Sequence, residues 1–198
     1  MLALNEIDFM TVQQHKENGD WPLEWLPVKA LLPYIKRLGP NTRGLEIGVA
    51  RAESSYAILE NCPNVVKLHG VDSYEPYQDW NGFVDQEHND KTKAIALENM
   101  KEFGDRWELF TERSDMFSVQ TVGNPDYDFI YVDGDHSYAG VLMDLRNYYS
   151  HVRSGGIFAG HDYNLGTVRQ ALDEFRSENK VRIPINLIDN NTWFWNKL

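Results

Sequence analysis

The sequence predicts an α/β fold, a doubly wound and mostly parallel sheet of seven strands with a C-terminal antiparallel hairpin. Short apolar runs alternate with helical patterns from position 43 onward, which is typical of a parallel sheet with helices on both faces. The last two strand-like runs, over 181–189 and 192–198, are separated by Asn190-Asn191, which suits the positive φ angles of a tight hairpin. We expect one domain, with an N-terminal helical cap segment over 1–41 and a Rossmann-like core over 42–198.

The elements of this fold can be assigned in order from their periodicity. The first is an amphipathic helix over Trp25–Leu38, interrupted at Pro33 and stopped by Gly39-Pro40. Five strands follow, each an apolar run: Arg43–Ile47, Val65–Val71, Trp107–Thr111, Tyr127–Val132 and a run that begins at Gly155-Gly156. The helices between and after them cover about Ala52–Glu60, Lys91–Phe103, Ser137–Arg153 and a stripe from Val168 to Phe175. A long polar loop is expected over Ser73–Asn89, with the aromatic residues Tyr74, Tyr77, Trp80 and Phe83.

Composition limits the classes of function. Of the 198 residues, 42% are hydrophobic, which is enough for one domain with a substantial core. With 19 basic and 30 acidic residues the net charge is −11, so neither nucleic acid nor an anionic membrane is expected as a partner. Cys62 is the sole cysteine, which excludes an intrachain disulfide and a cysteine metal cluster. No apolar run has the length of a membrane span and Met1–Asp8 lacks a secretory pattern, so we expect a cytoplasmic protein.

The stretch GLEIGVARAESS, over Gly44–Ser55, ends the first strand and opens a helix. Small residues in such a turn let the backbone approach a ligand, and the helix N-terminus offers N–H groups to a carboxylate or phosphate. Asp72 ends the second strand, where an acid accepts hydrogen bonds from ribose hydroxyls in doubly wound folds. These features suit any ligand that contains adenosine.

A nicotinamide dinucleotide is the obvious alternative ligand. Its fingerprint G-x-G-x-x-G is absent, because Gly44 and Gly48 lie four positions apart. Glu46 lies between them, which is unfavourable beside a pyrophosphate and favourable beside a cationic ligand. The remaining interpretation is a plain turn, with two turn glycines and Glu46 as a solvated acid.

Glu46-x-Gly48-x-x-x-Ala52-x-Ser54 resembles the first motif of the class I S-adenosylmethionine-dependent methyltransferases. It is most similar to the O-methyltransferase branch, whose motif reads E-x-G-x-x-x-G-x-S. Ala52 replaces the last glycine, so we expect a slightly tighter turn. The resemblance implies that Ser54 and the nearby backbone hold the methionine carboxylate of the cofactor and that Glu46 holds its amino side.

The same resemblance extends to the ends of the next strands. It implies that Asp72, with Ser73 beside it, binds the ribose of S-adenosylmethionine. It places Ser114-Asp115 at the edge of the adenine, and it adds Asp133 to the residues around the cofactor.

The fourth and fifth strands both run into acids and a histidine, in YVDGDHSYAG at 131–140 and FAGHDYN at 158–164. Asp133-Gly134 could signal a hairpin, but a helical stripe follows it. The turn then lies at the carboxyl end of the strand, the edge where ligands bind in open α/β sheets. If the two strands are neighbours, Asp133, His161 and Asp162 face one another as potential metal ligands. Carboxylates suit Mg²⁺, and an imidazole favours Mn²⁺, Fe²⁺ or Zn²⁺.

These two stretches resemble the metal-dependent O-methyltransferases that act on sugar hydroxyls of antibiotics and on catechol-like phenols. In those families the acid that ends strand four and a polar pair that ends strand five bind a divalent ion. The resemblance implies Asp133, His161 and Asp162 as ligands, although the family has an acid where this chain has His161. A site without metal, in which His161 is the base, is the alternative.

Two further residues are candidates for the general base. The sugar-directed relatives have an acid, interpreted as the base, at the position of Asp135, and the catechol-type relatives have a basic residue at that of His136. Both residue types can remove a proton near neutrality in a suitable environment. The choice between them stays open.

The resemblance implies in-line transfer of a methyl group from S-adenosylmethionine to a hydroxyl of a small-molecule acceptor. The aromatic residues of the loop over 73–89 are expected either to cover the site as a lid or to pack against the body. Trp21 and Trp25 could complete a roof or join a homodimer interface. Two other classes are kept as alternatives, a nucleotide-sugar or dinucleotide enzyme of the same topology and a non-catalytic adenosine-binding module.

Overall fold

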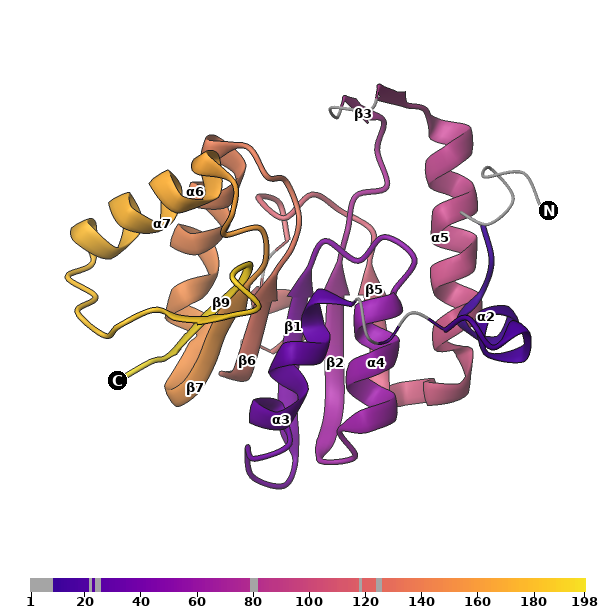
Figure 1. Ribbon diagram of the computed structural model, residues 1–198, viewed down its shortest axis with the longest axis horizontal. Helices are drawn as coiled ribbons and strands as arrows, with labels where there is room; N and C mark the ends of the chain where they lie inside the picture. The colour runs from indigo at the N-terminus through magenta and orange to yellow at the C-terminus, as the bar shows by residue number, and fades with distance from the viewer. Residues whose placement is uncertain (1–8, 22, 24–25, 79–81, 118, 124–125) are drawn as a thin grey trace.

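A computed structural model gives the fold and describes residues 9–21, 23, 26–78, 82–117, 119–123 and 126–198. Its centre is a seven-stranded sheet in the order β5-β2-β1-β6-β7-β9-β8 (Figure 1). The strands are β1 (Thr42–Ile47), β2 (Val65–Val71), β5 (Trp107–Phe110), β6 (Tyr127–Val132), β7 (Val152–Gly160), β8 (Asn186–Ile188) and β9 (Thr192–Asn196). Neighbouring strands pair in parallel except at β9, which is antiparallel to both β7 and β8. The predicted α/β fold is confirmed.

Helices cover both faces of the sheet (Figure 1). Each face has its own apolar core. One face is covered by α2 (Val12–Asn18), η2 (Pro27–Leu31), α3 (Leu32–Ile35), α4 (Glu53–Asn61) and α5 (Gln86–Met100), which continues into η3 (Lys101–Arg106). The other is covered by η4 (Val119–Val122), α6 (Tyr138–Tyr148), η5 (Tyr149–His151) and α7 (Gly166–Glu178). Side chains alternate along β6, so that Phe129 and Tyr131 pack on the first face and Ile130 and Val132 on the second. Among the described residues, no helix is long and apolar enough to cross a membrane.

The N-terminal segment and the loop after β2 differ from the prediction. The expected helix over 25–38 is a 3-10 turn followed by the single turn of α3, which has Pro33 at its start; Trp25 lies outside the described residues. Helix α5 begins at Gln86 rather than Lys91, because the Asp85 side chain accepts the His88 N–H and caps it. The shorter loop before it forms a small antiparallel hairpin of β3 (Tyr77–Gln78) and β4 (Phe83–Val84).

The connection from α6 to β7 also differs. The predicted helix over 137–153 ends at Tyr148, and Val152 already belongs to β7. The pairing of β6 with β7 jumps from Tyr127–Val152 to Phe129–Ile157. The predicted helix stop, Gly155-Gly156, therefore lies in a bulge of the strand, where Gly155 has a φ of 77°.

The C-terminal hairpin turns one residue earlier than predicted. The residues with positive φ are Asp189 and Asn190, and the N–H of Asn191 donates to the carbonyl of Ile188. Asn191 is thereby placed after the turn, where it contacts the end of β7.

The strand register brings the two predicted sites to one edge of the sheet. Ile47 pairs with Val132 and Val132 with Gly160, so Gly48, Asp133 and His161 follow the carboxyl ends of three adjacent strands. The Asp133 N–H donates to Ile47 O (2.8 Å) and the His161 N–H to Val132 O (3.2 Å). The β3–β4 hairpin lies beyond this edge, on the side of β1 and β2 (Figure 1).

Candidate active site

The turn between β1 and α4 keeps the shape that the motif demands. Gly48 has a φ of 84°, and a Cβ there would lie 2.2 Å from the carbonyl oxygen of Asp133. Ala52 stands where the motif has its last glycine and adopts the left-handed conformation, with a φ of 60°, while fully buried. A left-handed alanine costs about 1–2 kcal/mol, so the turn is preserved with some strain.

Asp72 holds this turn in place. Its Oδ2 accepts the N–H groups of Val49 and Ala50, both at 2.9 Å, and its Oδ1 accepts that of Tyr74 at 3.0 Å. A carboxylate can accept about four hydrogen bonds, so capacity is left for a ribose hydroxyl. Binding of ribose by Asp72 and Ser73 stays a prediction, and any substitution of Asp72 would also disturb the turn.

Glu46 is a buried acid. Its exposed fraction is 1%, and it accepts a hydrogen bond from the Ser55 hydroxyl, to which Trp107 Nε1 donates in turn (3.2 Å). Its pKa is raised to about 8, mainly by burial; the hydrogen bond from Ser55 opposes the rise, and the nearby Asp133 and Asp72 contribute to it. The interpretation of Glu46 as a solvated acid is therefore wrong. Ser54, at the first turn of α4, is only partly buried.

The predicted adenine edge, Ser114-Asp115, contains an ion pair and lies over a buried acid. Arg113 donates two hydrogen bonds to Asp115, at 2.9 and 3.0 Å. Below it, Asp144 on α6 is 1% exposed, and burial raises its pKa to about 7 against a hydrogen bond with Ser114. Sequence reasoning missed Asp144. The available signal was an acid beside Leu145, within the apolar stripe of α6.

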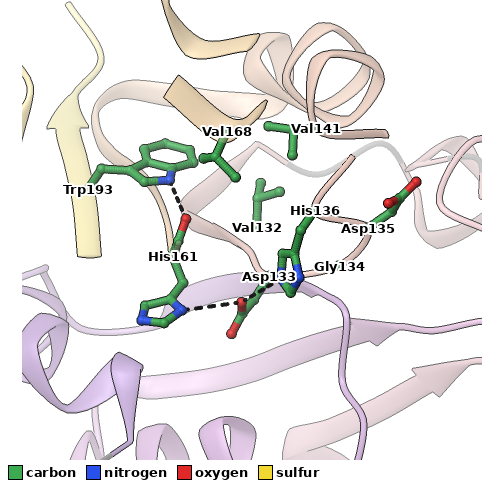
Figure 2. Close-up of a pocket in the computed structure, with 9 residues that line it drawn as sticks. All are labelled: Val132, Asp133, Gly134, Asp135, His136, Val141, His161, Val168 and Trp193. Carbon is green, nitrogen blue, oxygen red and sulfur yellow. Dashed lines mark hydrogen bonds and ion pairs between the residues drawn. The ribbon is translucent and has the colours of Figure 1, made fainter. Parts of the chain in front are cut away.

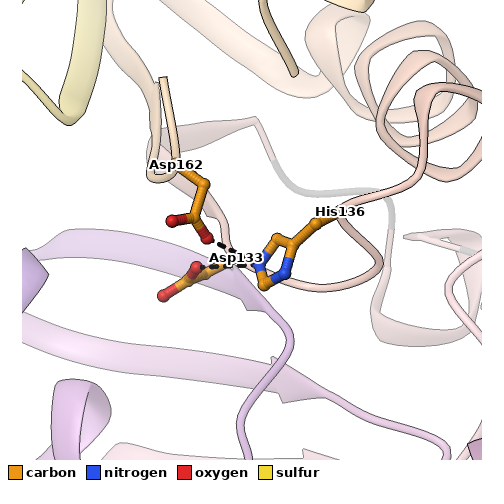
Figure 3. Close-up of side chains that lie close together, drawn as sticks. All are labelled: Asp133, His136 and Asp162. Carbon is orange, nitrogen blue, oxygen red and sulfur yellow. Dashed lines mark ion pairs between the residues drawn. The ribbon is translucent and has the colours of Figure 1, made fainter. Parts of the chain in front are cut away.

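The acids and histidines after β6 and β7 do meet, because these strands are neighbours. His136 Nε2 lies 2.9 Å from Asp162 Oδ2 and 3.6 Å from Asp133 Oδ1 (Figure 3). One ligand atom from each of Asp133, His136 and Asp162 lies within 4.8 Å of the others, and all three residues are partly buried. The geometry thus groups His136 with the two acids, where the sequence favoured His161.

The charges of this cluster compensate one another. Close contacts with the carboxylates of Asp133 and Asp162 raise the pKa of His136 to about 10, although burial acts to lower it. Burial favours the neutral form of Asp162, but contacts with His136 and His161 hold its pKa well below the usual range. Without another cation, His136 is therefore an imidazolium between carboxylates at neutral pH.

His161 contacts Asp133 from the side opposite His136 (Figure 2), and it contacts Asp162 as well. Its Nδ1 lies 3.2 Å from Asp162 Oδ1 and 3.8 Å from Asp133 Oδ1, and its Nε2 lies 2.8 Å from the side-chain nitrogen of Asn191. Burial lowers the pKa of His161, but Asp162 and Asp133 outweigh burial and raise it above the ordinary value. Asn191 had no signal in the sequence beyond its place in a turn.

Asp135 points away from the cluster (Figure 2). Its carboxylate accepts both the N–H and the hydroxyl of Ser137, each at 2.8 Å, at the start of α6. The Cβ that Gly140 lacks would lie 2.3 Å from Asp135 Oδ2, so the acid packs over the first helical turn. Of the two predicted bases, only His136 faces Asp133 and Asp162.

The aromatic residues after β2 divide into two groups. Tyr74 is 4% exposed and donates to the carbonyl of Ala50 (2.7 Å), so it packs against the body. Tyr77 and Phe83, on the β3–β4 hairpin, are 52% and 67% exposed. Trp80 lies outside the described residues. Of the described aromatic residues in this loop, only those on the hairpin stay candidates for the predicted lid.

A comparison with protein-family models matches residues 45–163 to a family described as a methyltransferase domain. The matched part runs from β1 to just beyond β7 and includes both strand-end sites. The chain belongs to the class I S-adenosylmethionine-dependent methyltransferases. A comparison with curated proteins finds no match.

Solved structures share the fold of this methyltransferase. The O-methyltransferase NovP is 18% identical, with 85% of this chain and 80% of that chain covered and a TM-score of 0.60. A Staphylococcus aureus protein proposed to be a caffeoyl-CoA O-methyltransferase is 13% identical, with 96% and 93% covered and a TM-score of 0.61. CalS11, a TDP-rhamnose 3′-O-methyltransferase of calicheamicin biosynthesis, is 12% identical, with 89% and 79% covered and a TM-score of 0.62. This chain spans 56% of the length of another similar structure, an O-methyltransferase family protein from Burkholderia thailandensis.

The family cofactor, S-adenosylmethionine, suits the charges of the methyltransferase's β1–α4 turn. Three acids lie around this turn: Glu46, Asp72 and Asp133. A cofactor with a sulfonium and an ammonium group would offset their charge, whereas a pyrophosphate would add to it. The family match also decides against the dinucleotide enzyme and the non-catalytic module.

Proposed function

We propose that this methyltransferase transfers the methyl group of S-adenosylmethionine to a hydroxyl of a small molecule, with the help of a divalent cation. The observation that carries the proposal is the position of Asp133. Its backbone contacts the Gly48 turn of the cofactor motif, and its side chain belongs to the cluster with His136 and Asp162. An acceptor at this cluster would lie next to the methyl group, as in-line transfer requires.

The donor set of the cluster suits a divalent cation. Two carboxylates and an imidazole, from Asp133, Asp162 and His136, would hold it and would suit Mn²⁺, Fe²⁺ or Zn²⁺ as well as Mg²⁺. When bound, the cation would polarise the acceptor hydroxyl and favour its deprotonated form. Because the pKa of His136 is about 10 without metal, His136 must release a proton to become a ligand, so metal affinity should rise with pH.

A site without metal is the second candidate, with His136 as the general base. Its position beside Asp133 and Asp162 supports this reading, but its pKa does not. An imidazole with a pKa of about 10 is protonated at neutral pH and cannot accept a second proton. The metal version is therefore favoured.

Chelation separates the two candidates. The protein is stripped of metal, and release of S-adenosylhomocysteine is measured with a panel of sugar and phenol acceptors, before and after addition of Mg²⁺ or Mn²⁺. We expect chelation to abolish turnover, with binding of S-adenosylhomocysteine largely kept, and metal to restore it. Asp133→Asn and Asp162→Asn should mimic chelation, whereas Asp173→Asn, on the exposed face of α7, should not. Full activity after exhaustive chelation would decide for the metal-free site.

The acceptor and the setting of the enzyme are also proposals. The net charge of −11 favours a small molecule over nucleic acid or an anionic membrane, and oxygen acceptors are named for several similar structures. Action in the cytoplasm, organisation as a single domain over 1–198 and pairing as a homodimer stay predictions. Gel filtration with light scattering tests the last of these.

A further inference from the structure

Asn191 connects the C-terminal hairpin to the loop after β7 through hydrogen bonds whose donors and acceptors are known. The N–H of Tyr163 donates to its backbone carbonyl (2.9 Å), and the N–H of Asn164 donates to its side-chain Oδ1 (3.1 Å). A backbone N–H can only donate, so the amide atom that faces Asn164 must be the oxygen. The usual ambiguity between the oxygen and nitrogen of an asparagine is thereby removed.

The amide nitrogen of Asn191 consequently faces His161. It lies 2.8 Å from His161 Nε2, and because an amide nitrogen only donates, Nε2 must accept and carry no proton. A neutral imidazole then has its proton on Nδ1, which lies 3.2 Å from Asp162 Oδ1 and can donate to it. An imidazolium would direct its Nε2–H at a second donor, so the amide opposes the effect of the two carboxylates on this ring.

A chain of polar contacts thus runs from the Asn164 N–H through Asn191 and His161 to Asp162. We propose that Asn191 is a positioning residue, which fixes His161 as the Nδ1–H tautomer and makes it an orienting donor to Asp162. Both ring nitrogens of His161 are then engaged, and His161 acts neither as the base nor as a metal ligand. Asp162 is held with its Oδ2 at 2.9 Å from His136. This inference rests on the proposed function, since it divides the roles of that site between two histidines.

Asn191→Asp isolates the donated hydrogen bond. The aspartate keeps an oxygen for the Asn164 N–H, so the loop after β7 stays attached, but it offers His161 an acceptor where the amide offered a donor. Asn190→Asp is the matched control, because it adds the same charge at an exposed neighbour in the same turn. Asn191→Ala, which loses both bonds, measures the purely structural contribution.

Nitrogen NMR of histidine-labelled protein reports the protonation of each ring nitrogen, and His161→Gln identifies the signals of His161 among the six histidines. We expect His161 to have a bare Nε2 and a protonated Nδ1 in the wild-type protein and in Asn190→Asp. In Asn191→Asp, Nε2 should gain a proton. A protonated Nε2 in the wild-type protein would overturn the inference without any variant, and so would an unchanged Nε2 in Asn191→Asp.

Turnover tests the positioning role. Loss of a partner behind a metal ligand typically lowers activity about ten- to a hundredfold, so kcat should fall by this factor in Asn191→Asp, with the affinity for S-adenosylhomocysteine unchanged. An unchanged kcat, despite the moved proton, would overturn the positioning role. If no acceptor is methylated by the wild-type protein, the proposed function fails, while the spectra still test the tautomer.

Discussion

Glu46 is a buried acid whose predicted role in cofactor binding can be tested through its proton. With a pKa of about 8, Glu46 is mostly protonated at pH 7 in the free protein. If it receives the ammonium group of S-adenosylmethionine, the charged form is favoured and the proton is released. Calorimetry at pH 7, in buffers with different ionisation enthalpies, should therefore show release of about one proton per cofactor bound. Glu46→Gln should bind without proton release. Equal heats in all buffers for the wild-type protein would show that Glu46 does not receive a cation.

At the scale of residues, the sequence indicates which residue types lie at the site but not where their side chains point. Asp133, Asp162 and both histidines could be placed at one edge, because strand ends follow from apolar runs. The choice between His136 and His161 could not be made, since it depends on the path of the turn after β6 and on Asn191, 30 residues beyond His161. Asp135 has the right residue type, yet its carboxylate bonds Ser137. Asp144 and Asn191 act through contacts that only the folded chain creates.

Three residues of the β1–α4 turn, Gly48, Ala50 and Ala52, lie in the left-handed region. Substitutions at Gly48 and at Ala52 are expected to have different effects on stability. Ala52→Gly relieves about 1–2 kcal/mol of backbone strain. It also loses about 0.8 kcal/mol of methyl burial and raises the entropy of the unfolded chain, which destabilises the fold by about 0.4–1 kcal/mol. These effects nearly cancel, so we expect a change within about 1 kcal/mol in the free energy of unfolding. Gly48→Ala drives a methyl group into the Asp133 backbone and should cost about 3 kcal/mol or more. Urea denaturation measures both, and similar costs for the two would contradict the strained turn.

The segment between β2 and α5 is anchored at one end and exposed at the other. Tyr74→Phe removes the hydrogen bond to the Ala50 carbonyl and should lower the free energy of unfolding by about 1 kcal/mol. Phe83→Ala, at a side chain that is 67% exposed, should change the free energy of unfolding by less than about 0.5 kcal/mol.

If the hairpin covers the acceptor, Phe83→Ala raises the KM for the acceptor. An unchanged KM would show that the hairpin is no lid.

Elements were predictable where one local signal dominates. The bounds of β2 and β6 agree with the predicted runs, because each is apolar and followed by an acid. The predictions were wrong where a tertiary contact overrides the local signal. Gly155-Gly156 is typical of the end of a helix, but in the fold it lies within β7, where the pairing with β6 shifts register and forms a bulge. The cap at Asp85 extends α5 back over a stretch of polar residues that resembles a loop.

The whole molecule was predictable as a fold because alternating strands and helices leave few topologies once crossovers are right-handed. The observed order confirms it, with the first and fourth predicted strands adjacent at the centre of the sheet. This adjacency brings the β1–α4 turn and the acid–histidine cluster together, although Glu46 and Asp162 are far apart in the sequence. The family match over 45–163 covers the same segment.

Two buried acids set the pH dependence of the stability of the whole molecule. The pKa is raised from 3.8 to about 7 for Asp144 and from 4.5 to about 8 for Glu46, so each takes up a proton when the chain folds. Stability is therefore full below the unfolded values and is lost as the pH rises from about 4 to about 8. The shift of Asp144 corresponds to a loss on the order of 4 kcal/mol. Urea denaturation should thus give a higher free energy of unfolding at pH 5.5 than at pH 8.5.

Asp144→Asn, an uncharged isostere, should be more stable than the wild-type protein at pH 8.5 and differ little at pH 5. A parallel loss in both proteins would show that Asp144 carries no raised pKa, and that Glu46 and the repulsion of 11 net negative charges set the trend without it.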